Sequence, residues 1–332
     1  MKLGAGLITC QRRPGDDRTY EDIYKEAITY AQSAEEVGLD SVWVSEHHFS
    51  DDGYLPGVFP TLGAIANATE SVEIGSCIAL APLYDPVRLA EDAATVSLLS
   101  GGRMTLGLGA GYYDEEFERF GVPKTERGDR LEDAVRICRG AWSDGPLEYD
   151  SPFHDTPSDT VITPKPTIEP SIFIGAYAKP AIRRAGRLTD GWCATSRLSQ
   201  EGLEARVEDI ERVRREVGAD EDFTNYIVVQ GFVGDSEEQA WQTVRDSLVH
   251  IEEQYAEFRT GEPVEYSREE IEQVRDTAVL GSPEQVCEEL EAYRDPLGDD
   301  CHVIFRSYHL GAGTEEMRRC HELLGDEVLP AL

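Results

Sequence analysis

The chain has 332 residues, which is enough for one (β/α)₈ barrel with insertions or for two domains of about 150 residues. Hydrophobic residues make up 40% of it, which supports a sizeable core and excludes wholesale disorder. The 65 acidic and 31 basic residues leave a formal charge of −34, which would repel nucleic-acid backbones and anionic membrane surfaces.

The acidic residues are spread from end to end, and arginine supplies nearly all of the positive charge. This pattern is typical of proteins adapted to high salt, so we expect a halophilic protein from a haloarchaeon. The 7 cysteines include no CxxC pair, so neither a disulfide framework nor a zinc site is expected. The N-terminal MKLGAGLITC indicates a strand rather than a signal peptide, and no apolar run approaches about 18 residues. We therefore expect a cytoplasmic protein without nucleic-acid or membrane partners.

Short apolar runs alternate along the chain with longer segments whose apolar residues have helical spacing. The predicted strands are 3–8, 41–44, 72–80, 104–108, 172–175, 192–194, 226–233 and 302–307. The predicted helices are 20–37, 60–68, 86–99, 129–142, 181–188, 200–217, 236–255, 268–275, 282–293 and 314–324.

Two stretches, about 144–170 and 256–280, interrupt this alternation, and we interpret them as insertions in a single domain that spans 1–332. Repeated strand-then-helix units require parallel pairing with right-handed crossovers, and eight of them predict a closed (β/α)₈ TIM barrel. The alternative is a doubly wound sheet. It calls for a GxGxxG turn after the first strand, and no such turn follows 3–8.

In such a barrel the active site lies at the C-terminal ends of the strands. The second strand leads into His47 and His48, which should face different surroundings because successive side chains alternate. A histidine at this place can donate a proton or hold an anionic intermediate near neutral pH, although a structural role is the alternative. The other histidines show no metal-ligand spacing, so we predict no metal site.

Small residues occur in or after three further strands. The third strand contains Cys77 and Ile78 among small residues, and 109–111 ends the fourth; small side chains there would let a flat ligand approach the backbone. An ordinary buried strand is the alternative for the third, and a tight barrel turn for the fourth. After the fifth strand, a helix starts whose free N–H groups favour a phosphate, and Lys179, Arg183 or Arg184 could add positive charge. A solvated helix face is the alternative for these three cations.

Taken together, these segments resemble the bacterial-luciferase-like oxidoreductases, and the resemblance covers nearly the whole chain. It is carried by SVWVSEHHFSDDG, SVEIGSCIALAPLYDPVRLAEDAATVSLLSGGRMTLGLGAGYYDEEFERFG, GAYAKPAIRRAGRLTDGW, AVLGSPEQV and GDEVLPAL. The resemblance implies a TIM barrel that uses reduced FMN or the deazaflavin coenzyme F420, and that usually forms a homodimer.

The resemblance also implies roles for particular residues. It places the catalytic His47 and His48 beside the flavin ring and matches Cys77–Ile78 to a peptide bond that is often cis in the family. It matches 256–280 to a mobile active-site loop. The cofactor-binding residues that it implies are Thr9, Glu46, Cys77, Ile78, Gly109, Ala110, Gly111, Gly175, Ala176, Tyr177, Lys179, Ala181 and Arg183.

Two positions depart from the pattern of particular members. Ala110 stands where the true luciferase subunit has an arginine, and Tyr112 stands where the deazaflavin-dependent sugar-phosphate dehydrogenases have a catalytic glutamate. We therefore expect neither luminescence nor sugar-phosphate oxidation. The leading prediction is hydride transfer between F420 and a small organic substrate. The alternatives are a reduced-FMN-dependent monooxygenase and a non-catalytic flavin-binding partner subunit.

Overall fold

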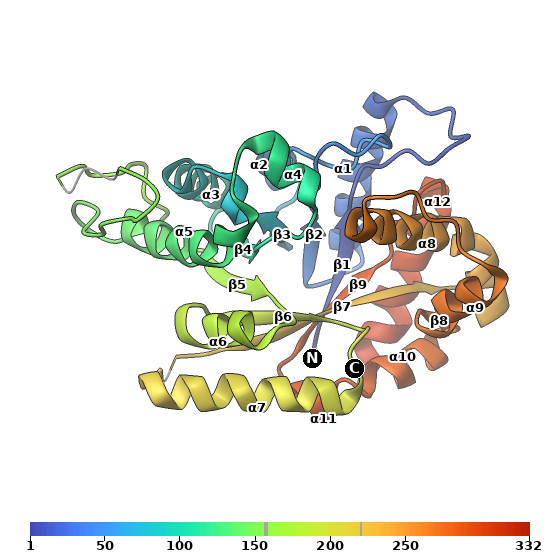
Figure 1. Cartoon of the computed structure of the whole chain (residues 1–332). Coiled ribbons are helices and arrows are strands. Elements are labelled where there is room, and N and C mark those ends of the chain that lie inside the picture. Colours follow the sequence, from blue (N-terminus) through green and yellow to red (C-terminus); the bar gives the residue numbers. More distant parts are fainter. Residues whose placement is uncertain (156–158, 220) are drawn as a thin grey trace.

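Parallel strands form the centre of the computed structural model, which describes residues 1–155, 159–219 and 221–332 (Figure 1). The strands are β1 (Lys2–Ile8), β2 (Ser41–Val44), β3 (Glu73–Leu80), β4 (Met104–Gly109), β5 (Ser171–Gly175), β6 (Gly191–Thr195), β7 (Thr224–Val233), β8 (Val279–Gly281) and β9 (His302–Arg306). Their order is β6-β5-β4-β3-β2-β1-β9-β7, and pairing of β6 with β7 closes the ring. The predicted (β/α)₈ TIM barrel is confirmed, and the short β8 pairs with β7 outside it.

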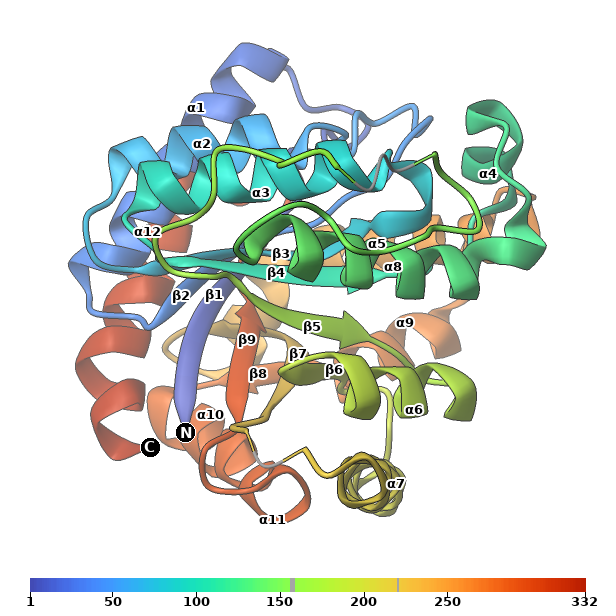
Figure 2. The same cartoon turned by 90° about the vertical axis from the view of Figure 1, so that its left-hand side faces the viewer.

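Helices surround this barrel, and the two chain ends lie side by side (Figures 1 and 2). The helices are α1 (Tyr20–Glu36), α2 (Val58–Ala68), α3 (Pro86–Ser100), α4 (Asp114–Phe120), α5 (Arg127–Trp142), α6 (Lys179–Leu188), α7 (Gln200–Val217), α8 (Glu237–Thr260), α9 (Arg268–Asp276), α10 (Pro283–Glu291), α11 (Arg294–Leu297) and α12 (Thr314–Leu323). Local sequence fixes their ends. At α1, for example, Thr19 and Asp22 form a reciprocal capping box.

The structure differs from the sequence prediction mainly in the connecting segments. Helices α4 and α11 and strand β8 were not predicted. Helix α8 continues to Thr260, so the stretch 256–280 starts as helix and then contains α9 and β8. The stretch 144–170 includes residues 156–158, which lie outside the described residues; its described remainder has neither helix nor strand.

Aromatic side chains fill part of the barrel interior. Trp43 is fully buried, and its ring centroid lies 5.5 Å from that of Phe173 and 5.7 Å from that of Tyr226. A Cβ added to Gly75 would lie 2.3 Å from the Trp43 ring, and one added to Gly107 would lie 2.3 Å from the Phe173 ring. These two glycines therefore make room for core rings.

Candidate active site

A buried histidine–carboxylate pair lies where β2 leads into its loop. Nδ1 of His47 lies 2.9 Å from Oε1 of Glu116, and both side chains are buried. A carboxylate only accepts, so we assign the proton to Nδ1, which leaves Nε2 as the atom that can exchange a proton. The same Glu116 oxygen accepts the backbone N–H of His48 at 2.9 Å, while its Oε2 is buried without a hydrogen-bond partner.

The neighbouring His48 belongs to a second histidine–carboxylate pair. Its Nε2 donates to Oε1 of Glu46 at 2.8 Å, and Tyr84 donates to the same oxygen at 2.8 Å. The other Glu46 oxygen accepts the backbone N–H of Leu80 at 2.7 Å, which ties the β2 loop to the end of β3. Burial, together with the nearby Glu46 charge, raises the pKa of Tyr84, so this phenol stays protonated. The two adjacent histidines thus have different surroundings, as alternation predicted.

Aromatic rings from three segments surround His47. Its ring centroid lies 4.8 Å from that of Tyr54, 5.6 Å from Tyr112, 6.0 Å from Tyr255 and 4.7 Å from Phe258. The last two belong to α8, so the C-terminal half of this helix lies over the histidine. Such rings exclude water from the imidazole, which strengthens its bond to the carboxylate.

A buried arginine lies at the end of β9. Nη1 of Arg306 donates to the Tyr255 hydroxyl at 2.9 Å, and that hydroxyl lies 2.9 Å from the hydroxyl of Tyr54. Tyr54 in turn donates to Ser45 at 3.1 Å. Arg306 is only 1% exposed, yet its Nε and Nη2 have no hydrogen-bond partner.

The small residues at the ends of β3, β4 and β5 lie around one side chain. The Cys77–Ile78 peptide bond is cis, as the resemblance implied. A Cβ added to Gly109 would lie 1.8 Å from Cδ1 of Ile78, and one added to Gly175 would lie 3.3 Å from its Cγ2. Both glycines thus accommodate Ile78, which is itself partly exposed. Ala110 and Gly111, which follow Gly109 in the chain, are also partly exposed.

The residues predicted to hold a phosphate start helix α6. Pro180 lies in the first turn, and no side chain caps the helix at Ala178. The N–H groups of Ala181 and Ile182 donate to the Ala178 carbonyl, so this turn offers fewer free donors than the sequence suggested. Ahead of the helix, Tyr177 lies 3.0 Å from Thr195 through its hydroxyl, and Trp192 donates to the carbonyl of Ala176 at 2.9 Å.

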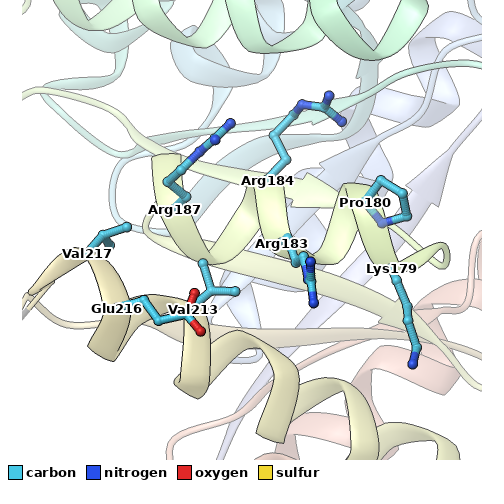
Figure 3. A pocket seen from close by; sticks show the side chains of 8 residues that line it. All are labelled: Lys179, Pro180, Arg183, Arg184, Arg187, Val213, Glu216 and Val217. Carbon is cyan, nitrogen blue, oxygen red and sulfur yellow. The ribbon is translucent and has the colours of Figure 1, made fainter.

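A groove of about 580 Å³ runs along α6 and is lined by side chains of α6 and α7 (Figure 3). Arg183 and Lys179 point toward α7, whereas Arg184 and Arg187 point away from it. Arg184 and Arg187 both pair with Glu132 of α5. The groove therefore follows the outside of the barrel, and only the Lys179 end of α6 lies near the strand ends.

Sequence reasoning found His47, His48 and Glu46 but missed Glu116, Tyr255 and Arg306. The structure brings the first three together with Glu116, and it places Lys179 and Arg183 on a separate helix. An available signal for Arg306 was a charged residue at the C-terminal end of an apolar barrel strand. Glu116 had no such signal, because it stands in an acidic run.

Within the described ranges, no group of three or more His, Cys, Asp or Glu side chains could hold a metal ion. No described helix has the length and apolar character that crossing a bilayer requires.

Fold and site together are those of a barrel enzyme whose polar groups gather at the carboxyl ends of its strands. The family described as Luciferase-like monooxygenase matches residues 4–300. The chain belongs to this family.

Similar proteins include oxygenases and deazaflavin enzymes. The oxygenase component of a flavin-dependent trigonelline monooxygenase from Acinetobacter baylyi is 26% identical over 98% of this chain and 94% of its own. An F420-dependent glucose-6-phosphate dehydrogenase from Amycolatopsis mediterranei is 32% identical over 57% of this chain and 63% of its own.

Among solved structures, monooxygenase RslO1 from Streptomyces bottropensis matches with a TM-score of 0.89 at 20% identity and 99% coverage of both chains. An F420-dependent secondary alcohol dehydrogenase matches with a TM-score of 0.75 at 20% identity, over 100% of this chain and 99% of its own. At these identities, the two structures show that the chain shares their fold.

Proposed function

We propose that this chain is an oxidoreductase that uses a flavin-type cofactor and that His47 moves the proton accompanying the redox step. The observation that carries the proposal is the buried pair of His47 and Glu116, with donor and acceptor 2.9 Å apart. A carboxylate at Nδ1 orients the ring and stabilises the charge that develops when Nε2 takes up a proton.

The second pair has a positioning role in this proposal. Both oxygens of Glu46 are engaged, by His48 and Tyr84 at one and by the Leu80 N–H at the other. Glu46 therefore ties the loop after β2 to the end of β3, and His48 and Tyr84 hold its carboxylate in place. The aromatic rings around His47 exclude water from the reaction.

The residues at the strand ends suit a flat ligand with a hydrogen-bonding edge. Oγ1 of Thr9 is buried and Oε1 of Gln230 is screened from solvent, and neither has a hydrogen-bond partner. Such atoms normally have one, so they point to a ligand with polar groups. We propose that Thr9, Cys77, Ile78 and 109–111 hold the ring and that 175–183 lies toward the phosphate end. When bound, the cofactor would supply two-electron chemistry.

The finer proposal is hydride transfer between F420 and a small organic substrate. It is supported by the 32% identity to an F420-dependent dehydrogenase. A second candidate, reduced-FMN-dependent monooxygenation, is supported by the likeness to the trigonelline oxygenase, which extends over 98% of this chain. We further propose a halophilic, cytoplasmic homodimer, whose assembly light scattering in molar salt would test.

Cofactor titration separates the two candidates. The purified chain in molar salt would be titrated with FMN and with F420, and fluorescence would be followed. Preferential F420 binding supports hydride transfer, and preferential FMN binding followed by oxygen uptake supports monooxygenation. A folded sample that binds neither would contradict the proposed function.

A further inference from the structure

We propose that Arg306 forms a binding site for a carboxylate, and hence that the substrate of the proposed oxidoreductase is a small carboxylic acid. That this carboxylic acid is the substrate rests on the proposed function, whereas the carboxylate site itself does not. It is carried by the unpartnered edge of a buried guanidinium.

The geometry of the free edge identifies the ligand. Nε and Nη2 lie on the same side of a guanidinium and present two parallel N–H donors, and these are the two atoms without partners in Arg306. A carboxylate accepts from such a pair with both oxygens at once. The remaining nitrogen, Nη1, already donates to Tyr255, which fixes the plane of the group.

Burial makes the missing partner informative. Arg306 is only 1% exposed and forms no ion pair with any described residue. Glu252 of α8, the carboxylate whose charge acts on Arg306, pairs instead with Arg197. An unpaired buried charge is strongly unfavourable, so proteins retain one where a ligand supplies the counter-charge.

A second arginine, Arg103, has a structural role and differs from Arg306 in the number of hydrogen bonds that its guanidinium makes. Arg103, before β4, donates to the carbonyls of Ser100, Val72, Ala66 and Thr69 and to the Thr69 hydroxyl. All of its nitrogens are therefore engaged. The Arg306 guanidinium makes one hydrogen bond, to the Tyr255 hydroxyl.

Two further polar atoms without partners lie on the neighbouring strands or directly after them. Gln230 of β7 is in register with Arg306, so the two side chains project from the same face of the sheet. Oε1 of Gln230 also lacks a partner. Oγ1 of Thr9, which we assign to the cofactor ring, lies three residues beyond Gly6, the β1 residue in register with Arg306. Because Oε1 of Gln230 only accepts, it calls for a hydrogen-bond donor on the ligand beside the carboxylate, such as a hydroxyl group.

The test compares benzoate with benzamide, which share a shape and differ in charge. Binding would be measured by calorimetry at fixed ionic strength on the wild-type chain, R306Q, R306K and the control R103Q. We expect benzoate to bind more tightly than benzamide, R306Q to weaken benzoate binding about 10- to 100-fold, and R306K to lie between. R103Q, which removes the same charge, should keep wild-type affinity.

The same oxyanion chemistry could come from the pyrimidine edge of a reduced cofactor, and a second arm distinguishes the two. If R306Q weakens cofactor binding and leaves benzoate unaffected, the carboxylate assignment is overturned. Unchanged affinity for both ligands overturns the site altogether. If the wild-type chain binds neither FMN nor F420 but R306Q loses benzoate binding, the proposed function is wrong and the carboxylate site is supported. Should R306Q not fold, R306K carries the comparison.

Discussion

Nδ1 of His47 and Oε1 of Glu116 are 2.9 Å apart in a site from which solvent is excluded. Glu116→Gln keeps the volume of the side chain but removes its charge and replaces one acceptor oxygen with a donor. We expect kcat to fall about 10- to 100-fold, because the imidazole loses the group that stabilises its charged form. Cofactor affinity should change less than about twofold, since both partners remain packed.

The matched control for this change is Glu118→Gln, an exposed residue on the same helix. It removes the same charge and should leave kcat unaltered. Equal effects of the two substitutions would show that Glu116 acts only through the net charge.

Replacing His47 and replacing His48 should affect different quantities, kcat in the first case and cofactor affinity in the second. His47→Asn removes the proton-carrying Nε2 and is expected to lower kcat about 100-fold or more. His48→Asn loses the bond to Glu46 and the ring contact with Phe120, neither of which carries the proton, so it should mainly weaken cofactor binding. Steady-state rates and fluorescence titrations on both variants check this. If neither substitution slows oxidation or reduction of the cofactor, the catalytic interpretation of the pair is wrong.

Two glycines of the same strand should respond differently to alanine. At Gly107 a Cβ would lie 2.0 Å from the backbone oxygen of Ser76, which cannot move, so we expect a loss of about 3 kcal/mol or more of unfolding free energy. At Gly109 the clash is with the flexible end of Ile78, at 1.8 Å, and a loss of about 1 kcal/mol is expected.

Urea unfolding of the single variants tests these values. Ile78→Val deletes the clashing Cδ1, so Gly109→Ala combined with Ile78→Val should be more stable than the sum of the single changes predicts. The same valine should not rescue Gly107→Ala. Additive behaviour at Gly109 would show that Ile78 does not occupy the space beside it.

The barrel could be predicted from sequence because its strands are buried on both faces. Such strands appear as short apolar runs, and the runs 41–44 and 226–233 mark β2 and the buried end of β7. The short β8 was missed because VLG is too brief to show any periodicity. The histidine pair was found because its place at a strand end is itself informative.

The partners of the histidines could not be predicted in the same way. Glu116 stands in the sequence DEEFERF, where an acid is expected to face solvent. Only the packing of α4 against the β2 loop buries it. Arg306 was included in a predicted strand, but its lack of partners depends on three strands and on Tyr255 from α8, which meet only in the folded barrel.

Buried histidines away from the site should set the acid stability of the protein. His321 of α12 is fully buried, and Nδ1 lies 2.7 Å from the hydroxyl of Ser33 while Nε2 has no partner. Burial lowers the pKa of His321 to about 3. Because the unfolded chain takes up this proton near pH 6.5, the contribution is complete above that pH and is lost as the pH falls from there toward about 3.

Replacing this side chain with glutamine removes the titration. Between pH 7 and pH 5 the wild-type chain should lose about 1–2 kcal/mol more unfolding free energy than His321→Gln, as measured by urea unfolding at fixed salt. Arg318→Gln, an exposed change on the same helix, should keep the wild-type slope. Equal losses in the wild type and in His321→Gln would mean that this histidine takes up its proton without unfolding, and that acid sensitivity arises at other buried groups such as His302, whose pKa burial lowers to about 3.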